Sequence, residues 1–183
     1  AVDAPDGFLV RSNYSYSGRG LDDRSDGWGP NRHDRALRLF QNAVEGNFLT
    51  YEFIIQWVIR NLNATDMDGY ELPFRNYYEN QPYGWIPIGG TICRGTTASV
   101  FVAQGVQEGE HPDNSIIWAL TGNPFGVITT PLWVRAGSVP VEHDGNDGSR
   151  ICTAAREIKS WVTIGGCANT FKLCNDNNTG YWD

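Results

Sequence analysis

Three β-type segments follow one another in the middle of the sequence, and this run limits the chain to folds that contain an antiparallel sheet. They read ASVFVAQ (98–104), SIIWALT (115–121) and GVITTPLWVR (126–135). The linker QGVQEGEHPDN predicts a hairpin between the first two segments. Pro131 interrupts the third segment, which we therefore expect to be bent or to lie at a sheet edge.

Stretches with helical periodicity lie on both sides of these strands. Leu37, Phe40 and Val44 recur at helical spacing within 33–44, and Thr50 is placed to cap a second helix that includes Leu62. We also expect an opening strand over 8–10 and a last helix over 150–161. The order strand, two helices, three strands, helix predicts an α+β fold with an antiparallel sheet and with helices grouped on one face.

Length and charge limit the organisation and the partners. A chain of 183 residues, 40% of them hydrophobic, suits a single domain or part of one over 1–183. The net charge of −7 and the absence of any Lys or Arg run argue against nucleic acid or an anionic membrane surface as partner. No apolar segment reaches the roughly 18 residues that span a bilayer. The start, AVDAPD, does not read as a signal peptide, so we expect a removed leader or a longer parent chain.

Several features are typical of an exported protein, and we predict a secreted or periplasmic location. Aromatic residues are abundant, and only 19% of the residues are charged. Sequons at Asn13, Asn63 and Asn177 are candidate glycosylation sites. Four cysteines permit three pairings, and the sequence leaves the choice open. Cys167 and Cys174 lie in a Gly- and Asn-rich stretch where a short disulfide-closed loop is geometrically easy.

The sequence offers little support for a metal site or a serine hydrolase. The cysteines form no C-x-x-C pair, and the Asp-rich segments 66–69 and 144–148 lack the terminal Glu of a calcium loop, so we interpret them as turns. There is no G-x-S-x-G motif, and His33, His111 and His143 are scattered along the chain. We therefore predict no metal and no cofactor, and we interpret the histidines as structural or solvated.

Arginines recur at the start of the first predicted helix. Arg32, Arg35 and Arg38 are spaced at i, i+3 and i+6, which places Arg32 and Arg35 near one another in the first turn. Cations at that end oppose the helix dipole, which favours anions there. Two interpretations remain open: a solvated helix face, or a pair of cations that meets an acidic partner or a substrate carboxylate.

Asn13 lies in the stretch GFLVRSNYSYSG, just after the predicted opening strand. Three roles are open for this residue: it is a glycan acceptor within Asn13-Tyr14-Ser15, it shapes a turn, or it is a hydrogen-bond donor placed at a strand end for chemistry. A buried side-chain amide and a glycosylated one exclude each other, because the sugar requires contact with water.

Four motifs in order resemble the second half of N-terminal-nucleophile (Ntn) amide hydrolases of the choloylglycine hydrolase and penicillin-acyltransferase-like group. They are GFLVRSNYSYSG, RHDRALRLF, TICRGTTASVFVAQGV and SIIWALTGNPFGVITTPLWV, and the likeness covers 7–161. The resemblance implies a four-layer αββα sandwich with antiparallel sheets, of which this chain supplies a part. It also implies hydrolysis of a linear amide, or transfer of its acyl group, by an N-terminal Cys whose own amine is the base.

The resemblance assigns roles to three residues. Asn13 matches the asparagine that stabilises the tetrahedral oxyanion, and Arg32 or Arg35 matches an arginine that acts in the active site or meets an acidic substrate group. The chain begins with Ala1, so the nucleophile is expected in a companion chain or a missing N-terminal half. The alternative is a catalytically inactive extracellular structural or ligand-binding glycoprotein on the same scaffold, with the aromatic loop 75–87 as a contact surface.

Overall fold

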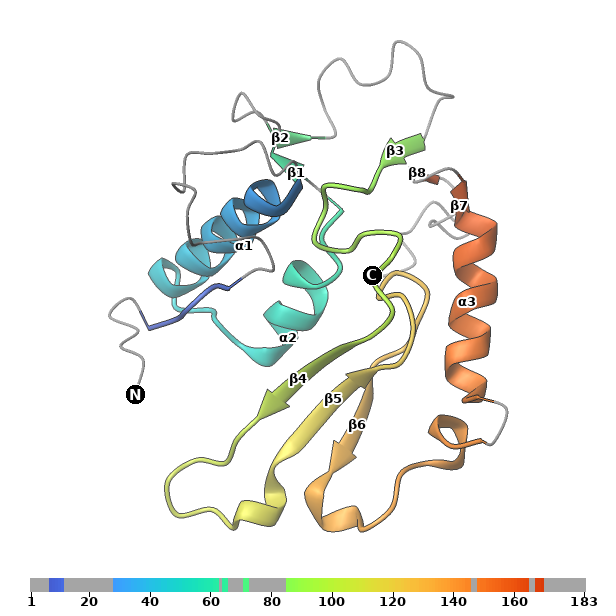
Figure 1. The fold of residues 1–183 in the computed structure, drawn as a ribbon. Coiled ribbons are helices and arrows are strands. Elements are labelled where there is room, and N and C mark those ends of the chain that lie inside the picture. The colour runs from blue at the N-terminus through green and yellow to red at the C-terminus, as the bar shows by residue number, and fades with distance from the viewer. Residues whose placement is uncertain are drawn as a thin grey trace, which may run out of the picture.

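The computed structural model describes residues 7–11, 28–62, 64–65, 71–72, 85–145, 148–164 and 167–169. These residues form an α+β structure of helices and antiparallel sheets (Figure 1). The helices are α1 (Trp28–Glu45), α2 (Tyr51–Phe53), its π-helical continuation η2 (Ile54–Val58) and α3 (Arg150–Val162), with 3-10 turns η3 (Pro112–Asn114), η4 (Val134–Ala136) and η5 (Val141–His143). The strands are β1 (Ala64–Thr65), β2 (Glu71–Leu72), β3 (Trp85–Pro87), β4 (Val100–Gln104), β5 (Ile116–Leu120), β6 (Thr130–Trp133), β7 (Thr163–Ile164) and β8 (Cys167–Asn169).

The sheet β4-β5-β6 confirms the predicted antiparallel strands and the hairpin between the first two. Val102 pairs with Trp118, and Trp118 pairs with Pro131 on the other side. Strand β6 is shorter than predicted, because 126–129 belong to a turn and loop in which the Gly126 N–H donates to the carbonyl of Asn123. Strand β6 is at an edge of this sheet, where the missing N–H of Pro131 is tolerated.

A second sheet, β3-β8-β7, forms from segments in which no strand was predicted, and β3 lies in the predicted aromatic loop 75–87. Trp85 pairs with Asn169, and Ile164 pairs with Cys167, both in antiparallel register. Strands β1 and β2 pair with each other. Each of these strands has only two or three residues, so local periodicity carries no signal for them. The pairing partner of β3 is far along the chain, which only the folded structure reveals.

The first helix begins earlier than the predicted 33–44 and starts at Trp28. Pro30 is compatible with this start, since the first-turn amides of a helix have no intrahelical acceptor. The predicted cap at Thr50 is confirmed, because its hydroxyl accepts a hydrogen bond from the Phe53 N–H at 3.2 Å. The second helix then widens into a π-helix, in which the Ile59 N–H donates to the Ile54 carbonyl at 3.0 Å.

The predicted opening strand is wrong. Residues 8–10 lie outside the sheets, and the Phe8 ring instead stacks on Phe40 of α1 with the centroids 5.6 Å apart. Three consecutive apolar residues can pack against a helix as well as within a sheet. The composition of 8–10 alone therefore did not determine the structure of this segment. None of the helices among the described residues has the length and apolar character needed to cross a membrane.

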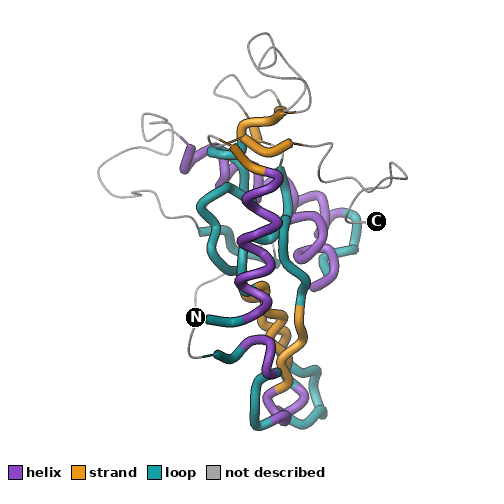
Figure 2. Tube along the Cα trace, turned by 90° about the vertical axis from the view of Figure 1, so that its right-hand side faces the viewer, coloured by secondary structure: helices purple, strands orange, loops and turns teal. Residues whose placement is uncertain are grey.

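The buried residues form two clusters near the upper end of the β4-β5-β6 sheet. One contains Ile88, Cys93, Phe125, Val162 and Ala168. The other contains Leu120, Val127 and Ala155, with Ile59 and Val100 packed against it. The end of η2 and helix α3 therefore both contact the sheet around Leu120, while the hairpin end of the sheet extends away from the helices (Figures 1 and 2).

Candidate functional site

The structure separates the three arginines of α1 into different environments. Arg35 is buried, with 9% of its surface exposed, and its Nε donates to Asn61 Oδ1 at 3.2 Å. Arg32 is half-buried, and its guanidinium donates to the Gly89 carbonyl at 3.3 Å. Arg38 is exposed. The interpretation as a solvated helix face is therefore correct only for Arg38.

Arg94 lies near Arg32, an arrangement that the sequence analysis missed. Burial lowers the pKa of Arg32, and the positive charge of Arg94 lowers it further. The two residues are far apart in the sequence, and Arg94 has no local pattern that marks it as a partner of α1. The charge of Arg94 therefore acts on a partly buried cation, and an anion bound near both residues would relieve the repulsion between them.

Asn123 holds the segment that carries Arg94. Its Nδ2 donates to the carbonyls of Arg94 and Thr97 at 2.9 and 3.1 Å. Its Oδ1 accepts from the Phe125 N–H, and it lies 3.6 Å from the Cys93 thiol. This buried amide holds the backbone carbonyls of Arg94 and Thr97, and it therefore positions the segment that carries the arginine.

The two cysteines whose side chains are described are both free, and Cys93 lacks the properties of a nucleophile. Cys93 is 0% exposed, and its burial raises the pKa of the thiol to about 12. Cys93 is therefore protonated and inaccessible at neutral pH, whereas a thiolate is the reactive form. Cys152 is exposed in the first turn of α3, and no cavity described here includes it.

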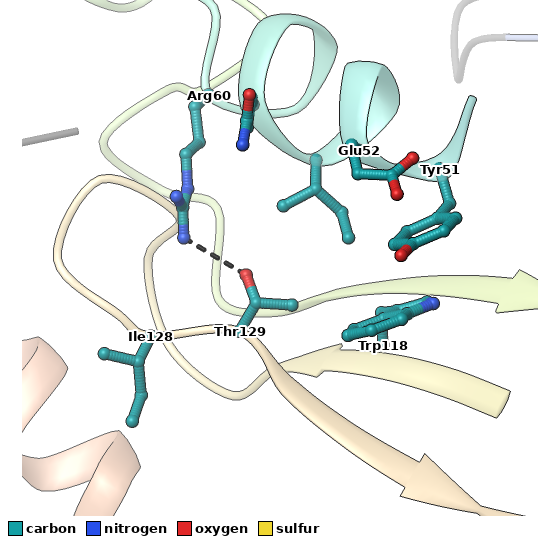
Figure 3. A pocket seen from close by; sticks show the side chains of 8 residues that line it. Tyr51, Glu52, Arg60, Trp118, Ile128 and Thr129 are labelled. Atoms are coloured by element: carbon teal, nitrogen blue, oxygen red, sulfur yellow. Dashed lines mark hydrogen bonds between the residues drawn. The ribbon is translucent and has the colours of Figure 1, made fainter. Parts of the chain in front are cut away.

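A pocket of about 430 Å³ opens between the α2–η2 helix and the β5-β6 side of the sheet (Figure 3). It has the size of a small-molecule site. The Tyr51 and Trp118 rings line one end, and Ile128 and Thr129 line the other. The remaining lining residues are Glu52, Ile55, Gln56 and Arg60. A π-helical turn contributes two of these residues, and such turns are frequent at functional sites.

Opposite charges mark the two ends of this pocket (Figure 3). At one end Arg60 donates to the Val127 carbonyl at 3.0 Å and to the Thr129 hydroxyl at 3.2 Å, and burial lowers its pKa. At the other end a hydrogen bond between the Tyr51 hydroxyl and the Glu52 carboxylate raises the pKa of Tyr51 and lowers that of Glu52. The guanidinium group of Arg60 is therefore held by neighbouring residues, whereas the Glu52 carboxylate is exposed.

Comparisons with protein-family models, with curated proteins and with solved structures gave no match. Two features of the described residues bear on the function. One is the pair of arginines Arg32 and Arg94, and the other is the pocket beside η2.

Several predicted site residues lie outside the described residues, namely Asn13, Asn63, Asn177 and Cys174. Their assignments, including a Cys167–Cys174 disulfide, stay predictions. Cys167 is in β8, where its backbone pairs with Pro87 and Ile164.

Each of the three histidines lies beside a neighbouring polar group. His111 accepts from the Asp113 N–H and caps the turn η3, as expected for a loop histidine. His33 lies 3.4 Å from the Asp34 carboxylate, and His143 lies 3.3 Å from the Thr121 hydroxyl. Within the described ranges, no group of three or more His, Cys, Asp or Glu side chains is placed to hold a metal ion.

Proposed function

We propose that this chain is part of an exported amide hydrolase or acyltransferase of the Ntn type, related to the choloylglycine hydrolase and penicillin-acyltransferase-like group. It cleaves a linear amide or transfers the acyl group, with an N-terminal Cys as nucleophile that is not among the residues of this chain. The burial of Cys93 supports this assignment, because its protonated thiol is unsuited to attack a carbonyl.

The observation that carries the proposal is the partial burial of Arg32 within the electrostatic reach of Arg94. Like charges at a partly buried position repel, and desolvation adds to the cost. A substrate carboxylate that binds between the two guanidinium groups removes this repulsion and gains charge-assisted hydrogen bonds. Arg35 lies one turn away and holds Asn61, so it positions the neighbouring helix end rather than pointing outward. The substrate is therefore an amide with an acidic group.

An exposed face of the β4-β5-β6 sheet supports the proposed αββα sandwich. Phe101 and Ile117 pair with Ala119 and Ala103, which places all four on the same face of the sheet. Phe101 is 60% exposed and Ile117 is 40% exposed, while Trp118 on the other face contacts α2. In an αββα sandwich, one face of each sheet packs on helices and the other face packs on the second sheet. The exposed apolar face is therefore the one that a second sheet would cover. We propose that this sheet comes from a companion chain or from the missing N-terminal half of the protein.

Asn13 is the proposed oxyanion donor of this active site. A side-chain amide fixed at the reacting centre stabilises the developing negative charge without reorganisation. Replacing Asn13 by Ala in the active protein should lower kcat by about two to three orders of magnitude. Mass analysis before and after deglycosylation provides an independent check, because a glycan on Asn13 is incompatible with this role. The same analysis tests Asn63, Asn177 and, after reduction, the Cys167–Cys174 bridge.

The test of the function compares an acidic and a neutral amide in the naturally processed protein. N-acylglycine and its methyl ester differ only in the charge of one carboxyl group, because the ester is neutral. Arg32→Ala should lower kcat/KM about 10- to 100-fold for the acidic substrate, and much less for the neutral one. Arg38→Ala is the matched control, because Arg38 is exposed on the same helix. We expect no effect of that variant on either substrate.

Two outcomes would contradict this function. If the protein binds amides but releases no product, the alternative of a non-catalytic binding glycoprotein replaces it. If Arg32→Ala lowers the turnover of both substrates equally, the arginines do not recognise an acidic group.

A further inference from the structure

The pocket beside η2 combines three features that point to a ligand of definite chemistry. It has an aromatic and aliphatic wall, formed by Tyr51, Ile55, Trp118 and Ile128. It has a positive group at one end and a negative group at the other, Arg60 and Glu52 (Figure 3). It is also lined by the π-helical turn, whose extra residue per turn changes which side chains face the sheet.

We propose that this pocket binds an elongated small-molecule zwitterion. Its carboxylate lies at Arg60, its ammonium group lies at Glu52, and its apolar body runs along the wall between them. Neither a purely apolar ligand nor a singly charged one matches both ends of the pocket. The assignment is independent of the amide hydrolase proposed above, because it concerns binding at residues to which that activity gives no role.

The spacing of the two charged residues sets the length of the ligand. Glu52 lies in α2, and Arg60 lies in the turn that follows η2, eight positions further along the chain; at the α-helical rise this separation corresponds to at most about 12 Å along the axis. A chain of seven methylene groups between an ammonium and a carboxylate spans a comparable distance. The 430 Å³ pocket accommodates such a molecule. We therefore use 8-aminooctanoate as the probe, and 4-aminobutanoate as the zwitterion that is too short.

The contacts of Arg60 and Tyr51 preorganise the pocket. Arg60 is held by the Val127 carbonyl and the Thr129 hydroxyl, and the ring of Tyr51, beside Glu52, is held by its stack on Trp118. A ligand that binds here does not need to order these side chains first, which reduces the entropic cost of binding. Because Glu52 is exposed, we expect it to contribute as little to the binding free energy as a surface ion pair does. The partly buried Arg60 should contribute more.

The experiment measures the dissociation constants of four probes by calorimetry on the folded protein. We expect 8-aminooctanoate to bind at least threefold more tightly than octanoate and tenfold more tightly than octylamine or 4-aminobutanoate. Backbone NMR shifts at Thr129 and Trp118 should locate the ligand in this pocket. Equal affinities for 8-aminooctanoate and octanoate, or no shifts at these residues, would overturn the proposal.

A variant at Glu52 tests the ammonium contact by itself. Glu52→Gln should remove the preference for 8-aminooctanoate over octanoate and leave octanoate binding unchanged, because only the ammonium contact is lost. Glu45→Gln, a matched change at an exposed position at the end of α1, should have no effect. If Glu52→Gln preserves the preference, the ammonium does not bind at Glu52 and the proposal fails. This test requires no catalytic activity, so its result is independent of the proposed amide hydrolase.

Discussion

The rings of Tyr51 and Trp118 stack with their centroids 4.7 Å apart and their planes 9° from parallel. This contact joins the first residue of α2 to the middle of β5, and it forms one wall of the pocket. The Trp118 indole also donates to the Gln104 side chain at 3.0 Å, across the β4–β5 pair. One side chain thus links the helix, both strands of the hairpin and the pocket.

Replacing Trp118 by Ala should therefore destabilise the protein. We expect the free energy of unfolding to fall by about 2–3 kcal/mol, less than for a fully buried tryptophan because Trp118 is half-buried. Trp118→Phe keeps a ring for the stack and loses the hydrogen bond, so it should cost about 1 kcal/mol. Trp133→Ala, on the same sheet but 50% exposed, is the control in the same urea titrations. A similar loss for both tryptophans would show that the stack is not the cause.

The stability of the protein should fall at alkaline pH because of Cys93. Its pKa is about 12 in the folded protein and about 8.5 in an unfolded chain, so the folded state holds the extra proton between these values. The contribution of this thiol is fully present below pH 8.5 and is lost as the pH rises toward 12, with a slope of about 1.4 kcal/mol per pH unit. Cys93→Ser should remove this component in denaturation curves measured from pH 7 to 11. Identical slopes in the two proteins would contradict the burial of a protonated thiol.

Asn123 should stabilise the protein by holding the segment that carries Arg94. Asn123→Ala removes the donor to two carbonyls, and we expect a loss of about 2–4 kcal/mol in the free energy of unfolding. Asn123→Asp also lacks the amide donor and adds a buried charge, so it should be less stable at pH 7 than at pH 4, where the carboxyl binds a proton more easily. Asn114→Ala, at an exposed position, should change the stability by less than about 0.5 kcal/mol. If Asn123→Ala behaves like this control, the hydrogen bonds do not hold the segment.

Gly122 allows helix α3 to approach the end of β5. Its φ is +149°, and a Cβ at this position would lie 2.4 Å from the Cβ of Ala155. Gly122→Ala should cost about 3 kcal/mol through overpacking and backbone strain. Ala155→Gly removes the opposing methyl group, so the double variant should be about 1 kcal/mol more stable than the sum of the single changes predicts. Gly105→Ala, which meets open space, is the control. Strict additivity in the double variant would rule out the close contact.

The sequence by itself determined the elements that have enough residues to show a period. The three strands of the β4-β5-β6 sheet, the hairpin, the cap at Thr50 and the last helix follow from local composition, because side chains must alternate or recur with the backbone geometry. The edge position of β6 follows from the missing N–H of Pro131. These are properties of adjacent residues.

Only the tertiary structure decided the features that depend on residues distant in the sequence. The short strand β3 pairs with β8, which also pairs with β7, and Phe8 packs on α1 rather than in a sheet. The effect of Arg94 on Arg32, and the apolar wall that Trp118 and Ile128 supply between Glu52 and Arg60, arise because separate segments pack around the buried clusters. Hydrophobic burial is non-directional. It brings these segments together, but no pattern in the sequence indicates which polar residues become neighbours as a result.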